Sequence, residues 1–429
     1  MKPEIKQRIE QLNNGKIPKG YQKTDFGVFP SDWVTDKKLI DIGTFGKGKG
    51  IPGNKMQSGG VPCVGYGDIY MKYNHFHFEE AQSFVDEETA KDSQLIKKGT
   101  LLFTGTGETA EEIGKCVCYN GDSTIYAGGD IITFVPQDVN PLFLAYQQYQ
   151  NFSLKKKASF GQGHSVVHIQ KESLEKLNVA YPESKKEQLR IVEILMKWDK
   201  AIELYDKQID ALTRYKAVCL RKMIPAKGQN VPEWRFQGFT GAWEQRKLGK
   251  LAIFNPKAEL PEIFEYVDLE SVVGTEMISH RTESKITAPS RAQRLARTGD
   301  LFYQTVRPYQ KNNYLFEKPD KHYVFSTGYA QMRPLVDGQF LLSLVQNENF
   351  VKMVLDNCTG TSYPAINSND LADIEVLSPT EKEEQRIIGS FFKGIGNLIT
   401  LHQRKKETII NQRKTLQQYL LNGIVRVKS

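Results

Sequence analysis

The sequence has 429 residues. Its formal net charge of +8 is compatible with a polyanionic partner but does not require one. A chain of this length is expected to form roughly two or three domains. No apolar run approaches the roughly 20 residues that span a bilayer, and the opening MKPEIKQRIEQL is charged, so we expect a cytoplasmic protein without membrane association. Its five cysteines are scattered and form no Cys-x-x-Cys pair, which excludes a disulfide framework and predicts reduced thiols.

The first part of the chain is predicted to be an α+β domain over residues 1–181. Short β-rich runs punctuated by glycine, such as GTLLFTGTG and STIYAGGDIITFVP, indicate strands and turns. The later stretch PLFLAYQQYQNFSLKKKA indicates a helix that follows those strands.

A long helix is predicted next, within residues 182–227. Ser184 and Glu187 have the capping-box spacing, in which a hydroxyl and a carboxylate satisfy free backbone N–H groups at a helix start. Apolar residues then recur at alternating steps of four and three, interrupted by Lys216, until Pro225 ends the helix. The residues of this stripe expected to pair with another helix are Ile191, Leu195, Trp198, Ile202, Ile209 and Leu212.

Residues 228–378 are predicted to form a second α+β domain, since runs such as EYVDLESVVG, GDLFYQTV and KHYVFSTGYAQMRPL again alternate with turns. Residues 379–429 are predicted to form a second long helix, with the capping-box spacing at Thr380 and Glu383. Its pairing stripe, interrupted by Lys406 and Arg413, comprises Ile388, Phe392, Ile395, Ile399, Ile409 and Leu416. Glycine costs about 1 kcal/mol relative to alanine inside a helix. We therefore expect this helix to fray or bend near its start, at Gly389, Gly394 and Gly396.

An internal repeat relates the two halves of the chain. The segment from Gly163 to Gln188 matches the segment from Gly360 to Gln385 at one fixed offset of 197 positions. Farther upstream the offset drifts, which places insertions in loops. We therefore predict two diverged copies of one α+β module, with long helices that pair as an antiparallel coiled coil. Two unrelated amphipathic helices on separate domains are the alternative.

Motifs for catalysis and cofactor binding are weak or missing. FTGTGETA follows an expected strand as a nucleotide-binding turn would, but the matching place in the second copy, QTVRPYQK, has no glycine. The sequence contains no Gly-x4-Gly-Lys-Ser/Thr phosphate loop and no Asn/Asp-Pro-Pro-aromatic tetrapeptide typical of amino-methyltransferases. The pairs His75 and His77, and His164 and His168, have no further ligands at metal-binding spacing. We expect no catalytic residues, no cofactor and no metal.

The order of globule, long helix, globule and long helix resembles the specificity (S) subunit of type I restriction-modification enzymes. The segments that carry the resemblance are Pro182-x4-Glu187-Gln188-x-x-Ile191, Pro379-x4-Glu384-Gln385-x-x-Ile388, and the openings Trp33 to Leu39 and Trp243 to Leu248. The resemblance implies two target recognition domains, each reading one half of an asymmetric two-part sequence in double-stranded DNA. It implies that the helices set the spacer and dock two methyltransferase (modification) subunits at the Glu-Gln-x-x-Ile segments. Restriction/translocase subunits complete a complex that directs adenine methylation and restriction, and the specificity subunit has no active site.

DNA-reading loops should combine cations for phosphates with side chains that read base edges. The loops Gln162 to Ser165 and Thr361 to Tyr363 occupy equivalent positions with different side chains, as two unlike half-sites would require. Each charge cluster is alternatively a solvated surface, and Tyr309 and Tyr363 are alternatively packing residues. The predicted DNA-binding residues are Lys47, Lys49, Lys155, Lys156, Lys157, Gln162, His164, Ser165, Arg291, Arg294, Arg307, Tyr309, Lys311, Thr361, Ser362, Tyr363 and Asn367.

Two other functions stay open from the residues alone. A non-DNA scaffold of two modules on a coiled-coil stalk explains the heptads, but not the basic loops near the variable centre of each copy. An orphan adenine methyltransferase would require bound S-adenosylmethionine, for which no motif is present.

Overall fold

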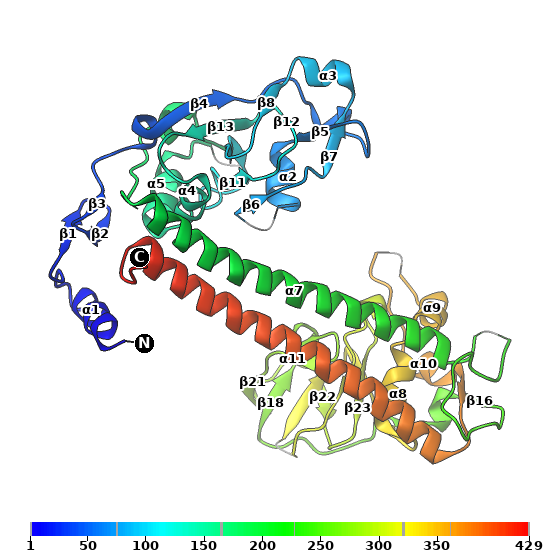
Figure 1. The fold of residues 1–429 in the computed structure, drawn as a ribbon. Helices are drawn as coiled ribbons and strands as arrows, with labels where there is room; N and C mark the ends of the chain where they lie inside the picture. Colours follow the sequence, from blue (N-terminus) through cyan, green and yellow to red (C-terminus); the bar gives the residue numbers. More distant parts are fainter. Residues whose placement is uncertain are drawn as a thin grey trace. The chain divides into compact units, whose positions relative to one another are not determined.

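The computed structural model describes residues 2–73, 76–163, 166–226, 228–319, 322–360 and 362–427 (Figure 1). The chain divides into two compact units: unit 1 is Met1–Leu204 with Lys406–Ser429, and unit 2 is Tyr205–Lys405. This division runs through both long helices, so that each unit contains part of each. The predicted four-segment division follows secondary structure rather than compactness, and it stays a prediction.

Two β-sheets form the body of unit 1. Strands LLFT and CVCY are buried at every position, which explains why they read as continuous apolar runs. Most neighbours pair antiparallel, whereas β6 joins β11 and β5 joins β12 in parallel. The five-stranded sheet has the order β4 (Gly43–Lys47), β13 (Ile131–Pro136), β9 (Leu101–Thr104), β11 (Cys116–Tyr119), β6 (His77–Phe78), and the four-stranded sheet β7 (Ser83–Val85), β5 (Val61–Val64), β12 (Ile125–Ala127), β8 (Gln94–Ile96).

Shorter elements complete unit 1. Helix α4 begins at Asn140, whose side chain accepts a hydrogen bond from Phe143 N at 3.1 Å, with Pro141 in the first turn. The core of the unit joins this helix to β9 and β11. The elements are α1 (Pro3–Asn13), β1 (Tyr21–Thr24), β2 (Gly27–Pro30), β3 (Trp33–Val34), α2 (Tyr66–Met71), α3 (Glu87–Lys91), β10 (Thr106–Gly107), α4 (Pro141–Gln147), α5 (Asn151–Phe160), β14 (Val167–His168), α6 (Lys171–Leu174) and β15 (Tyr181–Pro182).

Unit 2 also contains two sheets, each of four strands. Their inner strands LFYQ and YVFS are fully buried, and β18 joins β25 in parallel. One sheet has the order β17 (Ala252–Phe254), β26 (Tyr329–Pro334), β23 (Leu301–Gln304), β24 (Tyr314–Leu315), and the other β21 (Arg281–Ser284), β18 (Ile263–Val267), β25 (Tyr323–Ser326), β22 (Ala292–Leu295). The remaining strands and helices are β16 (Glu244–Lys247), β19 (Val272–Val273), β20 (Glu276–Met277), α8 (Gly338–Val345), α9 (Glu348–Asp356), α10 (Ser368–Asp373) and β27 (Glu375–Ser378). The chain is therefore a mixed helix and sheet protein, in agreement with the predicted α+β class.

The two long helices are α7 (Lys185–Met223) and α11 (Lys382–Leu421). In unit 1 the start of α7 shares a core with the end of α11, and in unit 2 the end of α7 shares a core with the start of α11. The predicted pairing residues that are buried are Ile191, Leu195, Ile388, Phe392 and Ile395. The partly buried ones are Trp198, Ile202, Ile209, Leu212, Ile399, Ile409 and Leu416.

A buried ion pair joins the two long helices in unit 1. Arg413 Nε on α11 donates to Asp199 Oδ1 on α7 at 2.8 Å, and the two side chains are 6% and 4% exposed. Tyr146 OH donates to Asp199 Oδ2 at 2.6 Å, and the guanidinium lies 4.2 Å from the centroid of the Phe76 ring. The interruption that Arg413 makes in the apolar stripe is thus a satisfied polar contact.

The matching positions of unit 2 lack this pair. The repeat offset makes Gly396 equivalent to Asp199, and Lys216 equivalent to Arg413. Lys216 and Gly396 line a cavity of about 160 Å³, and burial lowers the pKa of Lys216. Unit 2 therefore keeps the cation of the pair and has lost its carboxylate.

The expected fraying of the second helix is wrong, because α11 is continuous from Lys382 to Leu421. Gly389 is required by close packing: a Cβ atom there would lie 2.4 Å from Asp337 Oδ1 and 2.7 Å from Phe340 N at the start of α8. Packing against α8 thus offsets the poor helix propensity of this glycine.

The capping boxes form only in part. Glu187 N donates to Ser184 Oγ at 3.3 Å, as predicted, but the Glu187 carboxylate binds Arg426 instead. At the second helix the Glu383 carboxylate binds Arg386, with Nε to Oε2 at 2.9 Å. Within the described ranges, none of the helices is both long and apolar enough to cross a membrane.

Candidate nucleic-acid interface

In unit 1 the predicted reading loop before the first long helix lies next to strand β10. β10 pairs antiparallel with β14, and Ile169 N donates to Gly105 O at 2.9 Å. Gln162 and His168 exchange two backbone hydrogen bonds of 3.0 and 2.8 Å, which close the loop between them. Because β10 continues from the buried strand β9, the described ends of the loop, at Gln162 and His168, are fixed to the core of the unit.

Unit 2 makes the same connections at the residues that the sequence repeat makes equivalent. Ile366 N donates to Thr305 O at 3.0 Å, in the place of Ile169 and Gly105. Thr359 and Ala365 exchange backbone hydrogen bonds of 2.9 and 3.0 Å, in the place of Gln162 and His168. Val306 forms a bridge with Ala365, as Thr106 does with His168. The loop frameworks of the two units therefore correspond bond by bond.

The side chains on these frameworks differ. In unit 1 the His168 Nδ1 atom lies 3.2 Å from Thr106 Oγ1, and the Gln162 side chain is exposed. In unit 2 the Arg307 guanidinium lies 4.4 Å from the centroid of the Tyr363 ring, whose residue is 62% exposed. Tyr309, also exposed, follows in the same loop. One framework thus presents imidazole and amide groups, and the other presents an arginine with two tyrosines.

Other predicted residues lie elsewhere in each unit. Lys47 and Lys49 are exposed at the end of β4 and in the turn that follows it, and Lys155 and Lys156 are exposed on α5. In unit 2, Arg291 precedes β22 and Arg294 lies on it; burial lowers the pKa of Arg294. Ser362 is exposed beside Tyr363, whereas His164, Ser165 and Thr361 lie outside the described residues.

Lys157 is a correction to the predicted DNA-binding set. Its residue is 1% exposed, and its Nζ donates to Gly114 O at 2.8 Å beneath helix α5. Burial lowers the pKa of Lys157 to about 8. A buried amine with a carbonyl partner is not available to a phosphate, so Lys157 braces α5 instead.

Two further predicted residues of unit 2 have internal partners. The Asn367 side chain caps α10, because its Oδ1 accepts from Asn369 N and Asp370 N, both at 2.9 Å. The Lys311 side chain forms an ion pair with Glu348, and the backbone carbonyl of Lys311 accepts a hydrogen bond from Gln346 Nε2 at 3.0 Å. Both residues therefore hold the framework rather than extend from it.

Sequence reasoning missed the brace beneath the reading loop of unit 1. Tyr70 on α2 places its OH 2.8 Å from Thr104 Oγ1 and donates to Thr106 O at 3.2 Å; burial raises its pKa. Tyr70 lies in the part of the chain where the two copies diverge, so the repeat gave no signal for it. Three exposed carboxylates also follow β10, at Glu108, Glu111 and Glu112. The surface here is of mixed sign, which the net charge does not reveal.

Comparisons with known proteins agree with this arrangement. A crystal structure of a type I restriction-modification S subunit from M. genitalium has a TM-score of 0.57 at 14% identity, covering 90% of this chain and 96% of that one. A chain from a type I restriction-modification system, solved to explain its assembly and conformational transition, has a TM-score of 0.53 at 15% identity, covering 95% and 98%. These likenesses concern the fold.

Sequence comparisons name the same class of protein. The family model for the type I restriction modification DNA specificity domain matches residues 30–214. The putative type I restriction enzyme MjaX specificity subunit of Methanocaldococcus jannaschii is 23% identical over 95% of this chain and 97% of its own length. The MjaVIII specificity subunit of that organism is 26% identical over 66% and 71%. In sequence, this chain is thus similar to type I restriction enzyme specificity subunits.

In this chain, the repeated Glu-Gln pair is buried. Gln188 Oε1 accepts from Asn140 N at 2.7 Å and its Nε2 donates to Pro182 O at 2.8 Å. Gln385 makes the matching contacts with Asp337 N at 3.3 Å and Pro379 O at 2.9 Å. Each glutamine therefore fastens the start of a globule helix, α4 or α8, to a long helix. The predicted docking of partners to this segment cannot use these side chains.

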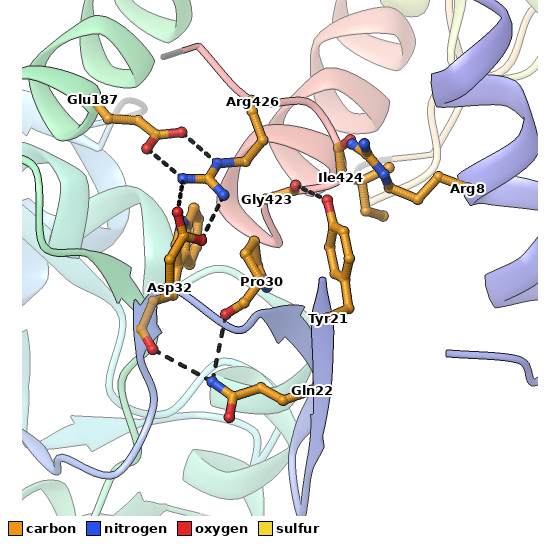
Figure 2. A network of polar contacts seen from close by, with 10 residues as sticks. Arg8, Tyr21, Gln22, Pro30, Asp32, Glu187, Gly423, Ile424 and Arg426 are labelled. Carbon is orange, nitrogen blue, oxygen red and sulfur yellow. Dashed lines mark hydrogen bonds and ion pairs between the residues drawn. The ribbon is translucent and has the colours of Figure 1, made fainter. Parts of the chain in front are cut away.

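The glutamates of the same motif bind arginines that follow the ends of the long helices. In unit 1, Arg426 lies between Glu187 and Asp32, with nitrogen to oxygen distances of 2.7 to 3.0 Å (Figure 2). In unit 2, Arg235 makes two hydrogen bonds to Glu384, of 2.7 and 2.8 Å. The chain after each helix is thus tied to the first turn of the other helix.

The residues that follow α11 are also held by the N-terminal segment of the chain. Tyr21 OH donates to Gly423 O at 2.5 Å, and Arg8 donates to Ile424 O (Figure 2). Gln22 Nε2 lies 3.4 Å from Pro30 O within the hairpin that carries Tyr21. The N-terminal arm therefore belongs to the structural frame of unit 1.

Proposed function

We propose that this chain is the DNA-reading subunit of a type I restriction-modification complex and is itself non-catalytic. One globule reads one half of an asymmetric two-part sequence, and the other globule reads the second half. Methyltransferase subunits, in two copies, carry the methylation of adenine, and restriction/translocase subunits join the full complex. The domains are residues 1–181 and 228–378, with helical spacers at 182–227 and 379–429.

The observation that carries this proposal is the corresponding framework of the two reading loops. The bonds at Gly105 and Ile169 recur at Thr305 and Ile366, and the sheets of the two units have matching strand orders. A scaffold used twice with different exposed side chains is what two unlike half-sites need, because base edges are read by side chains and not by the framework. This correspondence supports two copies of one module.

The long helices set the spacer between the two half-sites. The cores that join α7 to α11 in both units, and the two arginine ties, support an antiparallel coiled coil. A pair of helices is stiff along its axis and rises about 1.5 Å per residue, so its length fixes a distance along the DNA. Partner subunits dock on the exposed faces of these helices.

The predicted DNA-binding set is kept except where the structure shows an internal role, and His164, Ser165 and Thr361 stay in it as predictions because they lie outside the described residues. Lys157 and Asn367 leave the predicted set, for the reasons given above, and Lys311 serves the framework. The residues proposed to contact DNA are Lys47, Lys49, Lys155, Lys156, Gln162, His164, Ser165, Arg291, Arg294, Arg307, Tyr309, Thr361, Ser362 and Tyr363.

The proposal is tested by measuring affinity for a random duplex at several salt concentrations, with and without the methyltransferase subunits. Phosphate contacts predict that log affinity falls steeply and linearly with log salt. A flat dependence, or no binding in the complete complex, contradicts DNA reading and favours the protein scaffold.

The spacer is tested separately by inserting one heptad into both long helices at exposed positions of the mid-helix. The insertion adds about 10 Å of rod, which lengthens the spacer by roughly three base pairs at about 3.4 Å each. Insertion into one helix alone is the control, because it breaks the register without lengthening the pair. An unchanged spacer in the doubly extended protein contradicts the role of the helices.

A further inference from the structure

Arg307 in unit 2 has an unusual backbone for a residue with a side chain. Its φ and ψ angles are 54° and 56°, in the left-handed region, and Lys311 in the same loop has φ of 56°. Residues other than glycine adopt this conformation at a cost, and they keep it only where the surroundings fix it. Such strain is concentrated at functional sites.

The surroundings of Arg307 do fix it. Arg307 N donates to Pro364 O at 2.8 Å, which joins its loop to the second reading loop. Beneath it, Gln304 Nε2 donates to Val306 O at 2.6 Å and lies 2.9 Å from Gln310 Oε1. The loop is therefore ordered before any ligand arrives, so that binding costs little conformational entropy.

The guanidinium of Arg307 has an aromatic partner and no carboxylate partner in the described ranges. It stacks on the exposed Tyr363 ring at 4.4 Å, and no carboxylate in the described ranges pairs with it. Two other arginines of unit 2 have carboxylate partners: Arg235 binds Glu384 and Arg333 binds Asp300. A planar guanidinium that contacts a ring and has no carboxylate partner keeps N–H donors for a ligand.

We propose that Arg307, positioned by Tyr363, reads a guanine in the half-site of unit 2. The two outer N–H groups of a guanidinium match O6 and N7 of guanine in the major groove, and this is the commonest specific contact between proteins and bases. The equivalent residues of unit 1 are Gly107 and Val166, which cannot make this contact. The reading is thus specific to one half-site. The inference rests on the proposed DNA-reading function and names the base that one residue selects.

The test uses the full chain assembled with its methyltransferase subunits. The principal variant is Arg307→Gly, because glycine adopts the left-handed backbone without strain, so the loop should fold at least as well. Arg307→Lys keeps the charge but lacks the planar fork. Arg246→Gln is the matched control, since it removes one exposed arginine, on β16, that is not among the residues proposed to contact DNA.

Methylated adenines are mapped on genomic DNA, and affinity is then measured for duplexes of the mapped sequence. The expected result is that Arg307→Gly and Arg307→Lys lose roughly 5- to 150-fold discrimination at one G·C pair of one half-site. All other positions and the spacer stay unchanged, and Arg246→Gln keeps the full motif. Replacing that guanine by 7-deazaguanine, which lacks the N7 acceptor, weakens the wild type and not Arg307→Gly.

Two outcomes overturn the inference. Arg307→Gly could weaken binding to all sequences equally and reduce the salt slope by about one, which identifies a phosphate contact. It could also leave the motif and the affinity unchanged, which shows that the side chain is outside the interface. A wild-type complex without sequence-specific methylation is a different result, because it rejects the proposed function and not only the role of Arg307.

Discussion

The buried pair of Asp199 and Arg413 makes a sharp prediction about the stability of unit 1. Replacement of Arg413 by methionine leaves the Asp199 carboxylate, 4% exposed, with only Tyr146 OH as a donor among the contacts described above. Removal of one partner from a buried ion pair typically costs about 3–5 kcal/mol, because the remaining charge stays desolvated. For a unit of this size, each 1 kcal/mol corresponds to about 2–4 °C in melting temperature. We therefore expect Arg413→Met to lower the melting temperature of unit 1 by about 6–20 °C.

The assay is a double-mutant cycle followed by thermal and denaturant unfolding. The cycle compares Arg413→Met and Asp199→Leu with the double variant, which removes both charges and should recover most of the loss. Lys216→Met in unit 2 is the matched control at the repeat-equivalent position. Because burial already lowers the pKa of Lys216 and Gly396 offers it no carboxylate, this change should be neutral or stabilising. A double variant as unstable as Arg413→Met, with no coupling in the cycle, would refute the reasoning.

Three further predictions concern stability. Leu195→Asp, at a fully buried position, should destabilise the chain by several kcal/mol, and Ile399→Asp, at a partly buried position, should destabilise it by less. Equal unfolding midpoints for the wild type and Leu195→Asp would show that the helices do not pack there. Gly389→Ala should destabilise α11 because its Cβ would meet Asp337 and Phe340. Gly394→Ala, with no atom within 4 Å of the added Cβ, should stabilise α11 by about 1 kcal/mol. A raised denaturant midpoint for Gly389→Ala, or a lowered one for Gly394→Ala, would contradict this packing. Since burial lowers the pKa of Lys157 to about 8, the folded state bears the cost of its charge below pH 8, so the wild type should gain stability relative to Lys157→Met as pH rises from about 8 towards 10. Melting temperatures of both proteins over this range check the sign, and a constant difference would rule it out.

The sequence predicted those features of the structure that correspond to a periodic or repeated pattern of residues. The long helices, with buried Ile191 and Phe392, were predictable because a stripe of apolar residues has a fixed spacing. The repeat located both proposed reading loops, since the backbone hydrogen bonds at Gln162 and Thr359 occupy equivalent positions.

The features that the sequence did not predict depend on contacts between residues that are distant in the sequence. Lys157 reads as part of a basic run, and only the tertiary position of Gly114 makes it a buried brace. Glu187 reads as a helix cap, yet its carboxylate binds Arg426, which the chain brings back from beyond a long helix. Gly389 reads as a helix breaker until the start of α8 is placed against it. Each of these depends on a close contact that local spacing does not encode.

The most direct test of the two-module account is a globule exchange with methylation mapping. Residues 1–181 are replaced by the matching globule of a related specificity subunit with different loops, and the chimera is assembled with the methyltransferase subunits. Sequencing of methylated adenines should show a new first half-site, with the second half-site and the spacer unchanged. A motif altered in both halves, or one that does not change at all, would contradict the claim that each globule reads its own half-site.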